Sequence, residues 1–490
     1  MCDYIDWCPS GHRFTILKTI VQNVSDISLI RSGAPLNFLQ QLKLTAQLSW
    51  PAMMAQLSSI MMQYIDAAMV GRLGADDSAA VGLVSTSLWL FWGICSAVTV
   101  GFSVQVAHRI GASDHEGARK VLRQSIVACL LFSLAVVIIG AAIAYPLPHW
   151  LGGTDAVCTK ASLYFLVFIL ALPLLTMNYL GGAMLRCVGN MKVPGGLNVM
   201  MCILDVIFNF FLIFPSREIN LLGHIVSVPG AGLGVLGAAL GTVSAEIVTA
   251  GSMMWYLCMK EKSIRLAGHP GSFRPTRSVL SKALRVSAPM TLEHAIICGA
   301  QIAVTVIVAP LGVMAIAANA FAVTAESICY MPGYGIGDAA TTLVGQSYGA
   351  KRLDLAKRFG YITVGLGMVT MTIMGVVMYV CAPWVMELMT PVTGIQTLGV
   401  EALRIEAFAE PMFAAAIVSY GVMIGVGDTI IPASMNFCSI WLVRLPIAAL
   451  LAPSMGLAGV WLAMCIELCF RGAIFLWRLI SGAWLKKGLK

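Results

Sequence analysis

Charged residues are scarce in this sequence, since Asp, Glu, Lys and Arg together make up only 11% of its 490 residues. Soluble domains contain about 25% charged and about 45–50% apolar residues, whereas 59% of this chain is hydrophobic. The composition therefore excludes a large soluble domain and indicates a protein that lies mostly within lipid. Because lipid forms no hydrogen bonds with free backbone groups, the membrane spans must be helices or a closed barrel.

Several motifs of soluble enzymes are also missing. The 14 cysteines include no Cys-x-x-Cys pair, which argues against a metal site or a disulfide framework. No P-loop is present, so we expect no direct use of ATP. Gly232-x-Gly234-x-x-Gly237 has the form of a dinucleotide-binding fingerprint, but it opens an apolar segment, and we interpret it, with Gly241, as close helix packing. We therefore expect no cofactor.

The chain does contain twelve apolar segments, each of about the 20 residues that cross a bilayer as a helix. The strands of a membrane barrel would instead give alternating segments of about ten residues. The sequence therefore predicts an all-α polytopic membrane protein with 12 transmembrane helices. The segments span residues 44–70, 79–107, 122–145, 160–184, 194–214, 234–257, 283–309, 315–345, 360–381, 398–424, 431–452 and 457–480.

The distribution of Lys and Arg predicts the orientation of these helices. With the N-terminus inside, 25 of the 31 Lys and Arg residues fall in cytoplasmic parts and four fall outside, at Arg72, Lys160, Arg217 and Arg404. This is the positive-inside pattern of membrane proteins, and it accounts for the net charge of +8 without a nucleic-acid partner. We expect a multi-pass protein of the plasma or inner membrane with both termini in the cytoplasm.

The two halves of the chain are an internal repeat. One constant shift along the sequence superposes Ser49-x-Pro51 on Ser287-x-Pro289, Gly111-Ala112 on Gly349-Ala350, and Asn198 on Asn436. The first half carries about 16 additional residues around 215–232. Because each half contains an even number of helices, the halves are parallel repeats that place a cavity between two lobes, as in alternating-access transporters.

These features divide the chain into five parts. We expect a cytosolic N-terminal extension, an N-lobe with helices 1–6, a basic cytoplasmic linker, a C-lobe with helices 7–12, and a cytosolic tail. The extension lacks the apolar core of a signal peptide, and around Phe14–Ile30 it resembles an amphipathic surface helix. The bounds are 1–43, 44–257, 258–282, 283–480 and 481–490.

Four motifs, taken in order, resemble those of the multidrug and toxic compound extrusion (MATE) family. They are Tyr64-Ile-Asp66-x-x-x-Val70-Gly71, Ala309-Pro-Leu-Gly312, Met331-Pro-Gly-Tyr-Gly335 leading to Gly345-Gln346-x-x-Gly349-Ala350, and Gly425-x-Gly427-Asp428-Thr429. The resemblance covers about residues 44–480. It implies a V-shaped pair of lobes that exports amphipathic, often cationic organic compounds, driven by entry of Na+ or H+. It implies a transporter rather than an enzyme.

Four oxygen-bearing side chains of the first half lie at similar depth. At about 1.5 Å per helical residue, Asp66 and Asn209 lie roughly 9 Å, Thr242 roughly 12 Å and Asp205 roughly 14–15 Å below the outer surface. Two carboxylates with an amide and a hydroxyl suit a hard cation such as Na+, and two crowded carboxyl groups also suit a proton carrier. The alternative is that these residues only form hydrogen bonds between helices.

The MATE resemblance implies the same cation site. Some members bind their coupling ion with an Asp of helix 1, an Asn and an Asp one turn apart on helix 5, and a Thr of helix 6. Here the helix-5 pair is reversed, with Asp205 before Asn209. The coupling ion therefore stays open between H+ and Na+, and we expect no other metal.

The second half has its own ionisable residues within predicted spans, where each costs about 2.5–3.5 kcal/mol and needs a partner or a cavity. We expect Glu467 to form a structural ion pair with Arg471, four residues later, and with Arg444 of the neighbouring helix. The remaining candidates face either the substrate or a second cation, and they are Glu293, His294, Glu326 and Glu410.

Two other functions are compatible with parts of the sequence. A lipid-linked precursor flippase of a related superfamily would need a basic cavity for pyrophosphate, for which the only candidates are Arg444, Arg471 and Arg186. A membrane-embedded enzyme would need clustered catalytic residues, but the seven His are dispersed. We therefore expect an antiporter that acts as a monomer on small organic molecules in a lipid membrane.

Overall fold

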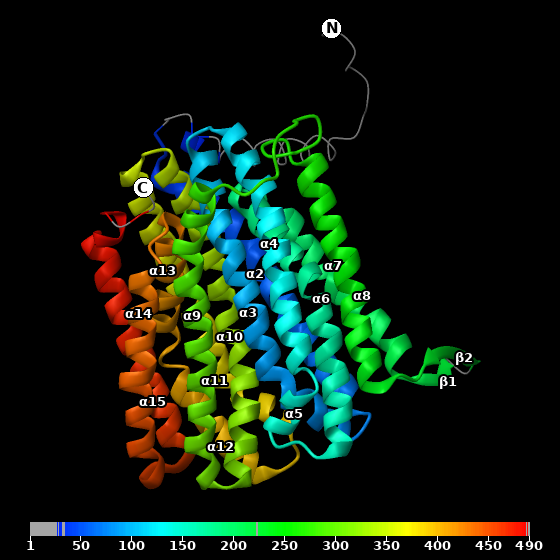
Figure 1. Cartoon of the computed structure of the whole chain (residues 1–490). Coiled ribbons are helices and arrows are strands. Elements are labelled where there is room, and N and C mark those ends of the chain that lie inside the picture. The colour runs from blue at the N-terminus through cyan, green and yellow to red at the C-terminus, as the bar shows by residue number, and fades with distance from the viewer. Residues whose placement is uncertain (1–26, 28, 32–34, 222–223, 487, 489–490) are drawn as a thin grey trace, which may run out of the picture.

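The computed structural model describes residues 27, 29–31, 35–221, 224–486 and 488, and it shows a bundle of long helices with one β-hairpin (Figure 1). The amphipathic helix predicted around Phe14–Ile30 lies almost entirely outside the described residues. The long helices of the first half are α2 (Phe38–Gly71), α3 (Ala75–Gly111), α4 (His115–Ile143), α6 (Asp155–Cys187), α7 (Lys192–Ile213) and α8 (Gly234–Trp255).

The second half repeats this order with more irregular helices. A π-helical turn, Ser439–Arg444, connects α14 to α15, and another, Tyr256–Lys260, extends α8. Short elements are α5 (Pro146–Trp150) and the 3-10 turns Ala309–Leu311 and Ala483–Lys486. The helices are α9 (Arg277–Val308), α10 (Val313–Gly349), α11 (Leu353–Met389), α12 (Thr393–Glu406), α13 (Glu410–Val426), α14 (Ile430–Cys438) and α15 (Leu445–Ser481).

These helices account for the twelve predicted spans. Among the described residues, nine helical stretches are long and apolar enough to cross a membrane, and α12 with α13 forms a tenth that bends by 60°. The stretch Ile430–Ser481 contains two spans, because the backbone leaves helical geometry at Gly456, where φ is 61°. The 34-residue α2, which is less apolar, is the remaining crossing.

The two halves pack as lobes that are joined by helix pairs related by the repeat. Helix α2 packs against α10, and its repeat counterpart α9 packs against α3. One shared core contains Leu44 and Leu48 of α2 with Ile336 and Leu343 of α10. The two-lobe, 12-helix architecture predicted from the sequence is therefore confirmed.

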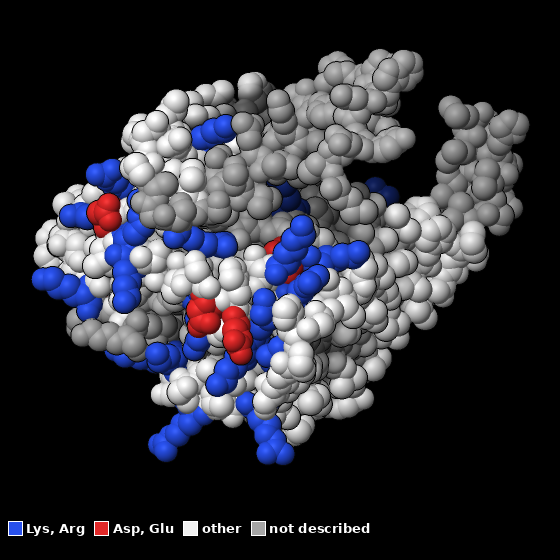
Figure 2. Space-filling view, turned by 90° about the horizontal axis from the view of Figure 1, so that it is seen from above, with Lys and Arg blue, Asp and Glu red and all other residues white. Residues whose placement is uncertain are grey.

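The two ends of the bundle differ in charge. The end of the molecule that is viewed in Figure 2 presents a dense group of Lys and Arg side chains, and the start of α2 and the end of α15 lie at this same end (Figures 1 and 2). Leu36, just before α2, and Trp484, just after α15, belong to one hydrophobic cluster. We refer to this end of the bundle as the basic end.

The opposite end carries the insertion that distinguishes the first half from the second. The additional residues form an antiparallel hairpin of β1 (Pro215–Leu221) and β2 (His224–Ala231), paired from Pro215 with Ala231 to Leu221 with His224 (Figure 1). The hairpin joins α7 to α8 and projects from the bundle (Figure 1). The sequence indicated extra residues here but not their strand structure.

The repeat is preserved down to single backbone angles at the basic end. Ser113 and Lys351, which occupy equivalent positions of the repeat, are the non-glycine residues with positive φ in the described chain, at 59° and 58°. Each sits in the turn that leaves α3 or α10.

After the first turn, Asp114 caps α4 by accepting from the Gly117 amide at 2.8 Å and from Arg109 at 2.7 Å. Partial burial favours a higher pKa for Asp114, but these bonds outweigh it and hold the pKa below its usual value.

Candidate functional site

The four predicted side chains of the N-lobe meet where α2, α7 and α8 pack together. The Asn209 amide donates to Asp66 Oδ1 at 2.8 Å and to Asp205 Oδ2 at 3.1 Å. Thr242 of α8 lies beside Asp205, while its hydroxyl donates to the Ala238 carbonyl at 3.1 Å. Two carboxyl groups that share one amide donor in a low-dielectric site favour a proton or a cation between them.

The N-lobe site combines close helix packing with buried oxygen atoms that have no hydrogen-bond partner among the described residues. A Cβ on Gly241 of α8 would collide with Asn209 Oδ1, and one on Gly237 would collide with the Leu212 carbonyl of α7. The glycine pattern is therefore a packing motif, as predicted. Asp205 and Asn209 are fully buried, yet one oxygen of each has no partner among the described residues. Buried acceptors of this kind fit either a proton or a small hard cation.

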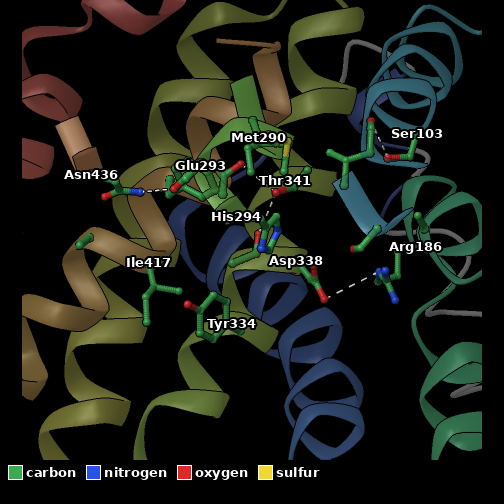
Figure 3. Close-up of a pocket in the computed structure, with 18 of the residues that line it drawn as sticks. Ser103, Arg186, Met290, Glu293, His294, Tyr334, Asp338, Thr341, Ile417 and Asn436 are labelled. Carbon is green, nitrogen blue, oxygen red and sulfur yellow. Dashed lines mark hydrogen bonds and ion pairs between the residues drawn. The ribbon is translucent and has the colours of Figure 1, made fainter. Parts of the chain in front are cut away.

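The C-lobe acid Glu293 is satisfied by neutral donors. It lies on α9 and accepts hydrogen bonds from the Tyr420 hydroxyl of α13 and the Asn436 amide of α14 (Figure 3). His294 also faces the space between the lobes, and its ring packs so closely against α3 that a Cβ on Gly93 would collide with it. These two candidates therefore line the same cavity.

A second group of C-lobe acids lies at the bend between α12 and α13. Glu406 ends α12 and Glu410 begins α13, and both are fully buried with no hydrogen-bond partner for their carboxyl oxygens in the described part of the chain. Glu326 of α10 is also buried. Glu326 and Glu410 were predicted from the sequence and Glu406 was not, although its position four residues before Glu410 was a usable signal.

The charged residues Arg444, Glu467 and Arg471 form a buried triad. Glu467 is fully buried and accepts from Arg444 and from Arg471 at 2.7 Å each, and from the Ser439 hydroxyl at 2.5 Å. The structure thus brings together the three residues expected to pair. The π-helical turn ends at Arg444, which places that side chain against α15.

Two further acidic residues were missed by the sequence analysis. Glu246 of α8 lies one turn beyond Thr242, and its carboxyl oxygens are buried without a hydrogen-bond partner among the described residues. Asp338 of α10 lies 3.8 Å from the Arg186 guanidinium of α6 (Figure 3). Both acids occur within apolar spans, where any carboxylate is a functional candidate, and that signal was available from the sequence.

A cavity of about 320 Å³ lies between the two lobes and collects many of these groups. Its polar lining includes Arg186 of the N-lobe and Glu293, His294 and Asp338 of the C-lobe (Figure 3). Tyr334 and other apolar or aromatic side chains complete the walls. A mainly apolar cavity with a few convergent polar groups is typical of a small-molecule site.

Hydrogen bonds between the lobes close the cavity toward the basic end. The residues that form them occupy equivalent positions of the internal repeat. His108 of α3 bonds to the Gly425 carbonyl of α13 at 2.8 Å, and Gln346 of α10 donates to the Cys187 carbonyl of α6 at 2.7 Å. His108 and Gln346 occupy equivalent positions of the repeat, and so do Cys187 and Gly425. The contact therefore has approximate two-fold symmetry, and we call it the inner gate.

Two equivalent glycines allow the inner gate to close. A Cβ on Gly111 would collide with the Gln346 carbonyl, and a Cβ on Gly349 would collide with the His108 carbonyl. These obstacles are backbone atoms, which cannot swing aside as a flexible side chain would. The closed gate therefore requires glycine on both helices.

We expect Gly349→Ala to hold the inner gate open, because the added methyl group occupies the space of the His108 carbonyl. Hydrogen–deuterium exchange at the ends of α3 and α10 should become faster. Gly365→Ala on α11, where a Cβ meets nothing within 4 Å, is the matched control and should leave exchange unchanged. Wild-type protection in Gly349→Ala would contradict this account of the gate.

Comparisons with known proteins agree with this architecture. The sequence profile of the MatE family matches residues 51–211 and 289–450, two stretches that begin at equivalent positions of the repeat. The chain is 24% identical over 452 residues to the probable multidrug resistance protein NorM of Thermotoga maritima, covering 90% of this chain and 93% of that protein. The NorM protein of Pseudomonas aeruginosa is 26% identical over 436 residues, covering 86% of each chain.

The fold also matches solved structures. A MOP superfamily transporter from Pyrococcus furiosus superposes with a TM-score of 0.84 at 21% identity, covering 94% of this chain and 99% of that chain. A mutant of the Vibrio cholerae MATE transporter VcmN gives a TM-score of 0.82 at 20% identity, covering 90% of this chain and 96% of that chain. At these identities the likeness concerns the fold alone.

Proposed function

Because this chain belongs to the MatE family of membrane transporters, we propose that it is an antiporter that exports amphipathic, often cationic organic compounds in exchange for H+ or Na+. The observation that carries the proposal is the pair formed by the partly buried Asp66 and the fully buried Asp205, bridged by Asn209 in one lobe. Relatives named as multidrug resistance proteins support the substrate class.

Hydrogen bonds connect the helix that carries Asp66 directly to the other lobe, and this supports the coupling of cation binding to movement of the lobes. Tyr64 lies two residues before Asp66 on α2, and its hydroxyl donates to the Thr324 carbonyl of α10 and bonds to Ser327 Oγ at 3.0 Å. A change of charge at Asp66 therefore acts on a helix that is tied to the C-lobe. Pro51 removes one backbone hydrogen bond from α2, and this gives the helix a place to bend.

The closeness of Asp66 and Asp205, which accept from the same Asn209 amide, favours a proton as the coupling ion, because two adjacent carboxylates in a low-dielectric site cannot both stay charged. The oxygen ligands also fit Na+, which would replace that proton. We propose that the protein acts as a monomer, since one chain encloses the cavity. By the positive-inside rule, the basic end faces the cytoplasm of a plasma or inner membrane.

The flippase alternative is less consistent with the charges around the cavity. Arg471 is engaged by Glu467, and Arg186 faces Asp338. A site for pyrophosphate needs cations that are free to bind phosphate oxygens. The carboxylates of this cavity instead suit a positively charged molecule.

Transport by the purified protein in proteoliposomes tests the proposal. Ethidium movement should follow an imposed pH gradient, an imposed Na+ gradient, or both, and vesicles without a gradient should show no accumulation. The gradient that drives transport identifies the coupling ion. Absence of ethidium transport under either gradient, from protein that is folded and correctly inserted, would contradict the proposal.

A further inference from the structure

The ion pair between Arg186 and Asp338 differs from the other buried pairs of this protein. The atoms are 3.8 Å apart, beyond hydrogen-bond distance, whereas Glu467 is 2.7 Å from each of its two arginines. Both side chains are partly exposed to the cavity, Arg186 by 26% and Asp338 by 35%. Asp338 receives no other side-chain hydrogen bond in the described chain, so its carboxylate is available to a ligand.

The other carboxylate of the cavity is not available in this way. Glu293 is buried and accepts from Tyr420 and Asn436. A cation would have to displace these donors to reach it. Of the two cavity acids, Asp338 is therefore the one that a ligand can approach directly.

The surroundings of Asp338 fit an organic cation. Tyr334 lies one turn away on α10, and Phe413 and Ile417 of α13 line the same cavity (Figure 3). Aromatic faces attract cations and accept apolar groups. The cavity thus offers one accessible carboxylate beside an apolar wall, which matches a molecule with one positive charge and a hydrophobic body.

Arg186 belongs to the opposite lobe and is placed to compete with a bound cation for the Asp338 carboxylate. It lies at the end of α6 (Figure 3). The next residue is Cys187, whose carbonyl receives the inner-gate bond from Gln346. The Arg186 carbonyl also accepts from Thr342, one turn beyond Asp338. When the lobes close at the basic end, these contacts hold the Arg186 guanidinium beside Asp338. When they separate, the guanidinium must move away with α6.

We propose that Asp338 binds the positive charge of the transported compound and that Arg186 competes for this carboxylate when the inner gate is closed. Substrate affinity is then high while the gate is open and low once it closes, so closure promotes release toward the opposite side. This inference rests on the proposed transport function, and it assigns the substrate-binding acid and the residue that displaces the substrate.

Equilibrium binding of tetraphenylphosphonium to the purified full-length protein, without any ion gradient, tests the inference. Asp338→Asn should weaken binding about tenfold or more, while Asp338→Glu should keep it close to wild type. Arg186→Gln should tighten binding about threefold or more, because the fraction of molecules with a free Asp338 increases. The Thr342 bond uses the backbone carbonyl of Arg186, so this substitution leaves that contact in place.

A double-mutant cycle identifies the competition. In the Asp338→Asn background, Arg186→Gln should no longer tighten binding. Neutral triphenylphosphine oxide should bind all variants equally. Unchanged phosphonium affinity in Asp338→Asn, or in folded Arg186→Gln, would overturn the inference, and so would an Arg186→Gln effect that persists without Asp338. Because no gradient is used, these outcomes are independent of the vesicle assay for coupled transport.

Discussion

Asp66→Asn abolishes gradient-driven ethidium transport in proteoliposomes while the protein stays folded: this is the result that the N-lobe geometry leads us to expect. An amide cannot take up or release a proton, and the substitution removes one of the two carboxylates from a site for Na+. Asn has nearly the same shape as Asp, so packing between α2 and α7 should be retained. Transport at the wild-type rate would contradict the role of Asp66.

Asp155→Asn provides the matched control for this prediction. It makes the same chemical change at the start of α6, where the Asp155 side chain is fully exposed, and transport should be unaffected. Circular dichroism and size-exclusion elution of both variants should match wild type. This comparison separates the loss of a functional carboxyl group from a general effect of replacing Asp.

The order of the helix-5 ligands can be tested in the same assay. Asp205 precedes Asn209 here, and the Asn209 amide bridges the two acids. The exchange Asp205→Asn with Asn209→Asp keeps the number and type of ligands but moves the carboxylate one turn along α7. Transport in the exchange variant, together with its loss in Asp205→Asn alone, would show that the set of ligands matters more than their order.

The grouping of the N-lobe side chains could be predicted from the sequence because it needed only helix geometry. The constant rise per residue of an α-helix, about 1.5 Å, places Asp66, Asn209 and Thr242 at similar depth without any knowledge of how the helices pack. The repeat also showed that the position equivalent to Asp66 is Val304, which the structure places against the hydrophobic core of the C-lobe. The two lobes therefore share a backbone plan, but the position of Asp66 has no acidic counterpart in the C-lobe.

Features that depend on the relation between the lobes were not predicted. Arg186 was named only as a candidate for a basic cavity, and its meeting with Asp338 follows from the way α6 and α10 approach each other. The 60° bend between α12 and α13, at which Glu406 and Glu410 lie, was also not predicted, because depth counting assumes a straight helix. The residues of the inner gate could have been predicted from the sequence, since His108 and Gln346 occupy equivalent positions of the repeat.

The largest expected effect on stability is that of Glu467→Gln. The variant leaves the Arg444 and Arg471 side chains, which are 13% and 12% exposed, without a counter-charge in the membrane interior. Breaking a buried ion pair by removing one partner costs about 3–5 kcal/mol, because the remaining charge stays desolvated. Thermal unfolding of the detergent-solubilised protein should begin at a clearly lower temperature than in wild type.

Replacing all three charges distinguishes this explanation from a loss of packing. Exchanging a complete buried ion network for apolar residues of similar size is often neutral or stabilising. The triple variant Arg444→Met, Glu467→Met and Arg471→Met should therefore recover much of the stability that Glu467→Gln loses. Glu387→Gln, at an exposed position of α11, should unfold as wild type does. If the triple variant were as unstable as Glu467→Gln, the cost would lie in the shape of the site rather than in its unpaired arginines, and the triad would contribute to the fold through packing.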